Sequence, residues 1–77
     1  MKFLVDLNKV EDVKDFVRIA EKYDTDITVG SQNKSFLVDG TSLMGVFSLD
    51  LSQPVVVNVS DKCAGDRFKE EIIRFVM

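Results

Sequence analysis

A serine followed by large apolar side chains is the segment of this chain best suited to chemistry with a partner. Ser42 precedes Leu43, Met44 and Phe47, and it stands where a short helix ending near Leu49 is expected to begin. A serine hydroxyl at this position caps free backbone amides. The same amides and the helix dipole also stabilise a phosphate placed there. Ser42 is therefore a candidate phosphorylation site, with a plain N-cap as the alternative.

The apolar residues after Ser42 are too many for so short a helix to bury. Leu43, Met44 and Phe47 are predicted to dock a protein partner, because methionine adapts to varied surfaces and aromatic side chains often anchor interfaces. We expect Met44 and Phe47 to be exposed, whereas Leu43 or Val46 should point into the core.

Several other kinds of site are disfavoured by the residues present. The chain has no histidine and one cysteine, so a zinc site is not expected and no serine has a histidine to activate it. Neither a calcium loop nor a glycine-rich phosphate loop is present. Cys63 is predicted to be a small residue near the start of the last helix. We therefore predict no metal, no cofactor and no enzymatic activity.

Length and charge restrict the class of protein. Residues 1–77 are predicted to form a single domain, with 45% hydrophobic and 30% charged residues. The net charge of −3 disfavours nucleic acid and anionic membranes as partners. No apolar run is long enough to cross a membrane, and the first residues do not resemble a signal peptide. A cytoplasmic location is therefore expected, which a lone cysteine also suits.

Apolar patterning predicts the element order βαββαβα. Strands are expected at residues 2–7, 26–30, 35–38 and 55–59, with a hairpin loop at 31–34. The first helix should begin at Asn8, with Glu11 completing a capping box, and should end by Tyr23. Its buried stripe is predicted to comprise Val10, Val13, Phe16, Val17 and Ala20. The last helix is expected from Ala64 to Met77, with Phe68, Ile72, Phe75 and Val76 on its apolar face.

These elements imply an α+β fold. Short connections require antiparallel strands, and helices with one apolar face must cover one face of a sheet. The prediction is an open-faced β-sandwich, in which a four-stranded antiparallel sheet carries its helices on one side. A ferredoxin-like arrangement is the alternative topology.

This layout resembles the HPr family, the phosphocarriers of the bacterial phosphoenolpyruvate-dependent sugar phosphotransferase system. The segment Ser42-Leu43-Met44-Gly45-Val46-Phe47-Ser48-Leu49 is similar to the family's Ser-Ile-Met-Gly-Val-Met-Ser-Leu, and Lys22-Tyr23-Asp24 resembles the end of its first helix. The resemblance covers nearly the whole chain from Lys22. It implies an HPr-like fold, and it places Ser42 at the family's regulatory serine and the apolar residues on its partner-binding patch.

One family motif is absent. The family begins its first helix with Gly-Ile-His-Ala-Arg-Pro, in which the histidine accepts phosphate. Here Asn8, Lys9 and Glu11 occupy that region, with Lys9 near the histidine position and Glu11 near the arginine position. A protonated lysine has no lone pair to attack phosphorus, and the acidic residues would repel a phosphoryl group. We predict a degenerate phosphohistidine loop that does not transfer phosphate.

The resemblance therefore implies a non-catalytic regulatory or protein-interaction module. Its expected partner is a protein: a regulator, a kinase or another phosphotransferase-system component. The catabolite-repression HPr-like group, which lacks the histidine and keeps the serine, offers a precedent and leaves a homodimer open. The alternatives are a divergent phosphocarrier component of that system and a self-associating structural domain.

Overall fold

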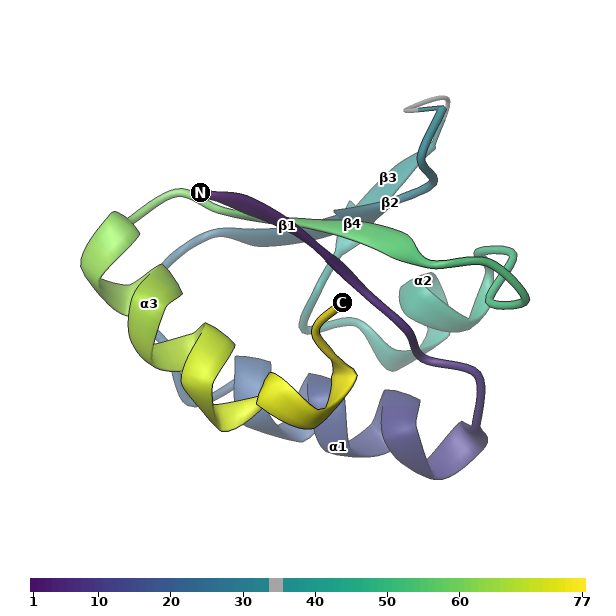
Figure 1. Cartoon of the computed structure of the whole chain (residues 1–77), viewed down its shortest axis with the longest axis horizontal. Helices are drawn as coiled ribbons and strands as arrows, with labels where there is room; N and C mark the ends of the chain where they lie inside the picture. The colour runs from purple at the N-terminus through teal and green to yellow at the C-terminus, as the bar shows by residue number, and fades with distance from the viewer. Residues whose placement is uncertain (34–35) are drawn as a thin grey trace.

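A computed structural model of the chain describes residues 1–33 and 36–77 (Figure 1). The elements are β1 (Lys2–Val5), α1 (Val10–Ala20), β2 (Ile27–Gly30), β3 (Leu37–Asp39), α2 (Leu43–Phe47), β4 (Val55–Val59), α3 (Lys62–Glu71) and the 3-10 turn η1 (Ile73–Phe75). This order confirms the predicted βαββαβα arrangement. The hairpin loop and third strand had been predicted to include Lys34 and Ser35, which lie outside the described residues.

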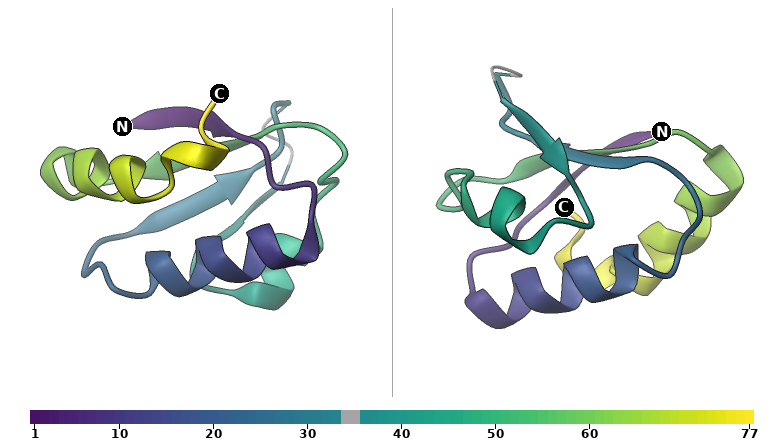
Figure 2. Two further views of the ribbon diagram at one scale, coloured as in Figure 1. Left: turned by 60° about the horizontal axis from the view of Figure 1, so that its bottom comes forward. Right: turned by 180° about the vertical axis from the view of Figure 1, so that it is seen from behind.

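The four strands form one antiparallel sheet in the order β1-β4-β2-β3. A ferredoxin-like sheet places its first and third strands side by side, whereas here β1 and β3 lie at opposite edges, so that alternative is excluded. Both figures show the helices on one face of the sheet (Figures 1 and 2). The fold is therefore the predicted α+β, HPr-like open-faced sandwich.

The core lies between the sheet and the helices. Alternate strand residues such as Val55, Val57 and Val59 point into it, because successive side chains of a strand face opposite sides. Phe16 and Phe68 are fully buried and pack edge to face with ring centroids 5.4 Å apart. Such aromatic pairs add about 0.5–1.5 kcal/mol to the burial of their area. This packing fixes the positions of α1 and α3 beneath the sheet.

The start of α1 differs from the prediction. Its N-cap is Lys9, which makes no side-chain capping bond, so the predicted capping box of Asn8 and Glu11 is wrong. Asn8 lies one residue too early to cap a helix that begins at Val10. Val10 itself is 58% exposed instead of buried. At 100° per residue it lies about 70° from the centre of the buried stripe, at the end of the helix.

The last helix also differs from the prediction. Asp61 caps α3 by accepting a hydrogen bond from the Cys63 amide at 3.1 Å, so the helix begins before Ala64. It ends at Glu71, and Val76 is extended and pairs with Val5 of β1. The prediction of helix up to Met77 is therefore wrong after Glu71.

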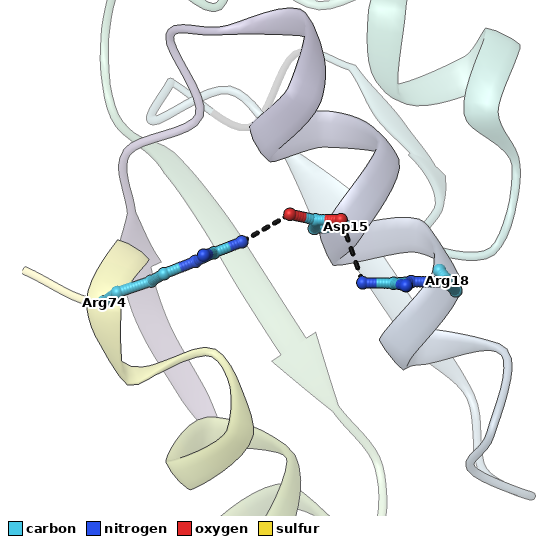
Figure 3. Close-up of polar contacts among 3 residues, drawn as sticks. All are labelled: Asp15, Arg18 and Arg74. Carbon is cyan, nitrogen blue, oxygen red and sulfur yellow. Dashed lines mark hydrogen bonds and ion pairs between the residues drawn. The ribbon is translucent and has the colours of Figure 1, made fainter.

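The C-terminal residues pair with the outer edge of β1. The Asp6 amide donates to the Phe75 carbonyl at 2.8 Å, and the Met77 amide donates to the Leu4 carbonyl at 3.1 Å. A charged network adds to this attachment (Figure 3). Asp15 of α1 accepts from Arg18 at 2.9 Å and from Arg74 of η1 at 2.5 Å. The end of the chain is thereby held against both β1 and α1.

Candidate functional site

The helix α2 is capped by the serine identified from the sequence. Ser42 has extended backbone angles, and its hydroxyl accepts a hydrogen bond from the Gly45 amide at 3.1 Å. The turn before it is fixed by Asp39, whose carboxylate accepts from the amide and hydroxyl of Thr41 at 2.9 and 2.8 Å. These two hydrogen bonds lower the pKa of Asp39. Ser42 is thus an N-cap in the structure, and its phosphorylation stays a prediction.

One side chain of α2 anchors the helix and three are exposed. Val46 is fully buried, which fulfils the expectation that Leu43 or Val46 points inward. Met44 is 81% exposed, and Leu43 and Phe47 are 36% and 37% exposed. We call Leu43, Met44 and Phe47 the α2 face. The exposure predicted for Met44 and Phe47 is confirmed, whereas their role in docking stays a prediction.

The α2 face carries no charge of its own. No residue from Gly40 to Leu49 is charged, in a chain that is 30% charged overall. A charge-free, exposed apolar segment buries at little desolvation cost, because few polar groups must lose their water. This composition suits the centre of a protein interface, where charged residues are depleted.

Val10 is an exposed apolar residue at the start of α1 and was not predicted as a site residue. The first turn of α1 and α2 lie at the same end of the molecule in both views of Figure 2, and the two helices are in contact. Val10 opens that turn and is more than half exposed. The signal that could have revealed it is its angular offset from the buried stripe of α1.

The predicted degenerate loop also lies at this end of α1. Asn8 and Lys9 precede the helix, Glu11 is in its first turn, and all three are exposed. In residues 1–33 and 36–77, none of these three side chains makes a hydrogen bond or an ion pair. The structure brings the loop and α2 to one end of the domain, but it does not organise the loop side chains into an anion-binding cradle.

A hollow of about 770 Å³ lies where the end of α1 meets α3. Within it the Tyr23 hydroxyl donates to Glu71, and Lys22 Nζ donates to the same carboxylate at 2.7 Å. Burial and the bond to Glu71 raise the pKa of Tyr23 to about 12. The bonds from Lys22 and Tyr23 lower the pKa of Glu71. These groups satisfy one another and leave no activated nucleophile.

Other kinds of site were also sought. Among the described residues, no group of three or more histidine, cysteine, aspartate or glutamate side chains is placed to hold a metal ion. Cys63 is exposed in the first turn of α3, near the start of the last helix as predicted. None of the helices in the described part of the chain is long and apolar enough to cross a membrane.

Comparison with known proteins identifies the fold. No protein-family model matches the sequence, and no curated protein matches it. Among solved structures, the crystal structure of a phosphocarrier protein HPr from Bacillus anthracis str. Ames superposes with a TM-score of 0.70 over 100% of this chain and 94% of that chain. The two sequences are 20% identical. The chain therefore shares the fold of that phosphocarrier protein.

Proposed function

We propose that this protein is a non-catalytic, HPr-like interaction module that binds a protein partner through the α2 face and does not carry phosphate on histidine. The observation that carries the proposal is the division of α2 into one buried anchor, Val46, and an exposed apolar side dominated by Met44. A helix that needed only to stabilise the domain would not require an 81% exposed methionine.

The loss of phosphotransfer follows from the chemistry of the residues present. Imidazole has a pKa of about 6.5, so it offers a free nitrogen to phosphorus at neutral pH. These 77 residues contain no histidine, and so they cannot form phosphohistidine. The exposed, unpaired side chains of Asn8, Lys9 and Glu11 supply no replacement.

Regulation at Ser42 is part of the proposal. A phosphate on this hydroxyl would replace the N-cap and face the free amides of the first turn of α2. It would bring a charge of about −1.5 to −2 to the edge of an otherwise uncharged face. Such a modification would change which partners bind without unfolding the domain.

Binding should be tested with purified components of the sugar phosphotransferase system, because the structural neighbour is a phosphocarrier. Calorimetric titration of the wild-type protein into the phosphoenolpyruvate-dependent kinase, and into a regulator that binds HPr, should detect binding to at least one. Met44→Ser should weaken that binding by at least about tenfold, the loss expected of an interface anchor. Ile73→Ser is the matched control, because Ile73 is apolar, 61% exposed and outside α2.

The two parts of the proposal can fail separately. Equal binding by wild type and the Met44→Ser variant would remove the docking claim. Stoichiometric labelling of the protein by the kinase and phosphoenolpyruvate would remove the claim that phosphotransfer is lost, and would favour a divergent phosphocarrier. A serine-kinase assay that labels wild type but not Ser42→Ala would support regulation at Ser42, and absence of label from both would contradict it.

A further inference from the structure

The sheet face opposite the helices carries two ordered rows of side chains. Strand pairing aligns Lys2, Asn58, Thr28 and Asp39 across the four strands, which we call the polar row. It likewise aligns Leu4, Val56, Gly30 and Leu37, which we call the apolar row. These positions alternate along each strand with residues that are buried in the core or packed against it, so both rows belong to the open face.

The apolar row is exposed at its two ends, whereas Val56 is half-buried and Gly30 is buried. Leu4 is 38% and Leu37 is 63% exposed. A Cβ atom on Gly30 would lie 2.3 Å from Leu37 Cδ2, so Leu37 leans over Gly30 toward Val56. Leu37 and Val56 line a groove of about 90 Å³ together with Lys2, Ser31 and Asn58. This face therefore offers apolar contact and room for an apolar side chain.

The edges of the sheet are less suited to self-association than its face. When two copies of a protein associate at the edges of their sheets, the free backbone N–H and C=O groups of the edge strands pair with each other. The outer edge of β1 already pairs with the chain around Val76, and β3 at the other edge is only 3 residues long. A second copy would find more unpartnered surface on the open face.

The charges on the polar row point to the kind of partner. Lys2 lies at one end of this row and Asp39 at the other, with two uncharged residues between them. A two-fold axis parallel to the strands would reverse the order of the strands and keep each row facing itself. Lys2 of each copy would then face Asp39 of the other, and Leu4 would face Leu37.

We propose that two copies of this chain associate face to face through the polar and apolar rows of their open sheets, related by a two-fold axis parallel to the strands. The same patch is used by both copies, as closed two-fold dimers require. Two sheets packed in this way lie about 10 Å apart. Apolar side chains of one copy enter the groove beside Leu37 and Val56 of the other, and two Lys2–Asp39 pairs fix the register.

The area of the face sets the strength of the dimer. Strands spaced about 4.8 Å apart and rising about 3.3 Å per residue give roughly 250 Å² of flat area for four strands and four residues. A stable complex buries about 800 Å² on each partner. The face is smaller than the interfaces of stable complexes, so the dimer is weak and transient. The ion pairs contribute mainly orientation, because exposed pairs add little affinity.

Sedimentation equilibrium and amide NMR spectra of the full chain, from about 0.02 to about 2 mM, test this dimer. We expect reversible dimerisation, with concentration-dependent shifts confined to the four strands and the residues next to them. Leu37→Glu should raise the dissociation constant by at least about tenfold, because it places an unpaired carboxylate in each half of the interface. Met44→Glu is the matched control, since it makes the same change at an exposed apolar residue of α2.

Two charge-reversal variants, Lys2→Glu and Lys14→Glu, provide a second test that does not depend on Leu37. Lys2→Glu should raise the dissociation constant roughly threefold to tenfold, because it sets like charges opposite each other. Lys14→Glu changes the net charge equally from an exposed position on α1 and should have less effect. A monomer at every concentration overturns the proposal. So does a dimer that Met44→Glu weakens more than Leu37→Glu, or one that neither variant changes.

Discussion

Val46 and Met44 lie two residues apart on α2. We predict that Val46 contributes to the stability of the domain and not directly to binding, whereas Met44 contributes to partner binding and little to stability. Val46 is fully buried, so Val46→Ala removes two packed methyl groups and leaves a cavity. At about 0.8 kcal/mol per group plus the cavity term, the variant should lose about 2–3 kcal/mol of unfolding free energy. Met44→Ala truncates a side chain that is 81% exposed and should change stability by less than about 0.5 kcal/mol.

The loss at Val46 is large relative to the whole domain. A chain of 77 residues has a total stability of roughly 4–12 kcal/mol. For a domain of this size, a loss of 2–3 kcal/mol lowers the midpoint of thermal unfolding by roughly 10–20 °C. Urea unfolding followed by far-ultraviolet circular dichroism measures the change in free energy directly, and the slope m reports whether unfolding still exposes the same surface.

The assignment of these two residues can be refuted by either variant. If Met44→Ala loses more than about 1 kcal/mol, the methionine is packed against the domain and is not free for a partner. If Val46→Ala loses less than about 0.5 kcal/mol, α2 is not anchored as described. Leu49, which is also buried, offers an independent check, because Leu49→Ala should cost at least as much as Val46→Ala.

Ser42→Ala should lower the unfolding free energy by about 1 kcal/mol in urea titrations, because it removes the N-cap of α2; an unchanged midpoint would contradict the cap. Tyr23 is the only tyrosine in a chain without tryptophan, so its ionisation can be followed by ultraviolet absorbance and should show a pKa of about 12. Since this folded pKa lies above the ordinary value of 10.0, the phenol's stabilising contribution is complete below pH 10 and is lost as the pH rises through about 12. Glu71→Gln should move this pKa down towards 10, although burial keeps it higher, and an unchanged titration would mean that Glu71 has no part in it. Asp15→Asn weakens contacts with Arg18 and Arg74 that are largely exposed, so it should cost less than about 1 kcal/mol, and a larger loss in urea would refute that assignment.

The parts of the fold that the sequence predicted are those where apolar periodicity was strong. The run from Val55 to Val59 and the stripe that contains Phe16 predicted their strand and helix correctly, because burial of one face dictates the spacing. The ends of the elements were less predictable. Val76 fits a helical stripe equally well, but its actual conformation depends on pairing with Val5, which is distant in sequence.

The candidate site was predictable in composition but not in full extent. The Ser42 cap and the exposed Met44 follow from local sequence, because a helix this short can bury only one side of itself. Val10 was assigned to the core because it follows the helical spacing, whereas its offset from the centre of the buried stripe, at the end of the helix, leaves it exposed. The complementary charges of Lys2 and Asp39 were not foreseen, since their relation depends on the register of four strands.

The pairing of β1 has a consequence for biosynthesis. The first strand leaves the ribosome early, yet its neighbours are β4, in which Asn58 pairs with Lys2, and the chain around Val76. Contacts between residues so far apart in sequence form late and slow the folding reaction. During synthesis β1 therefore remains unpaired until β4, whose Asn58 pairs with Lys2, has also left the ribosome.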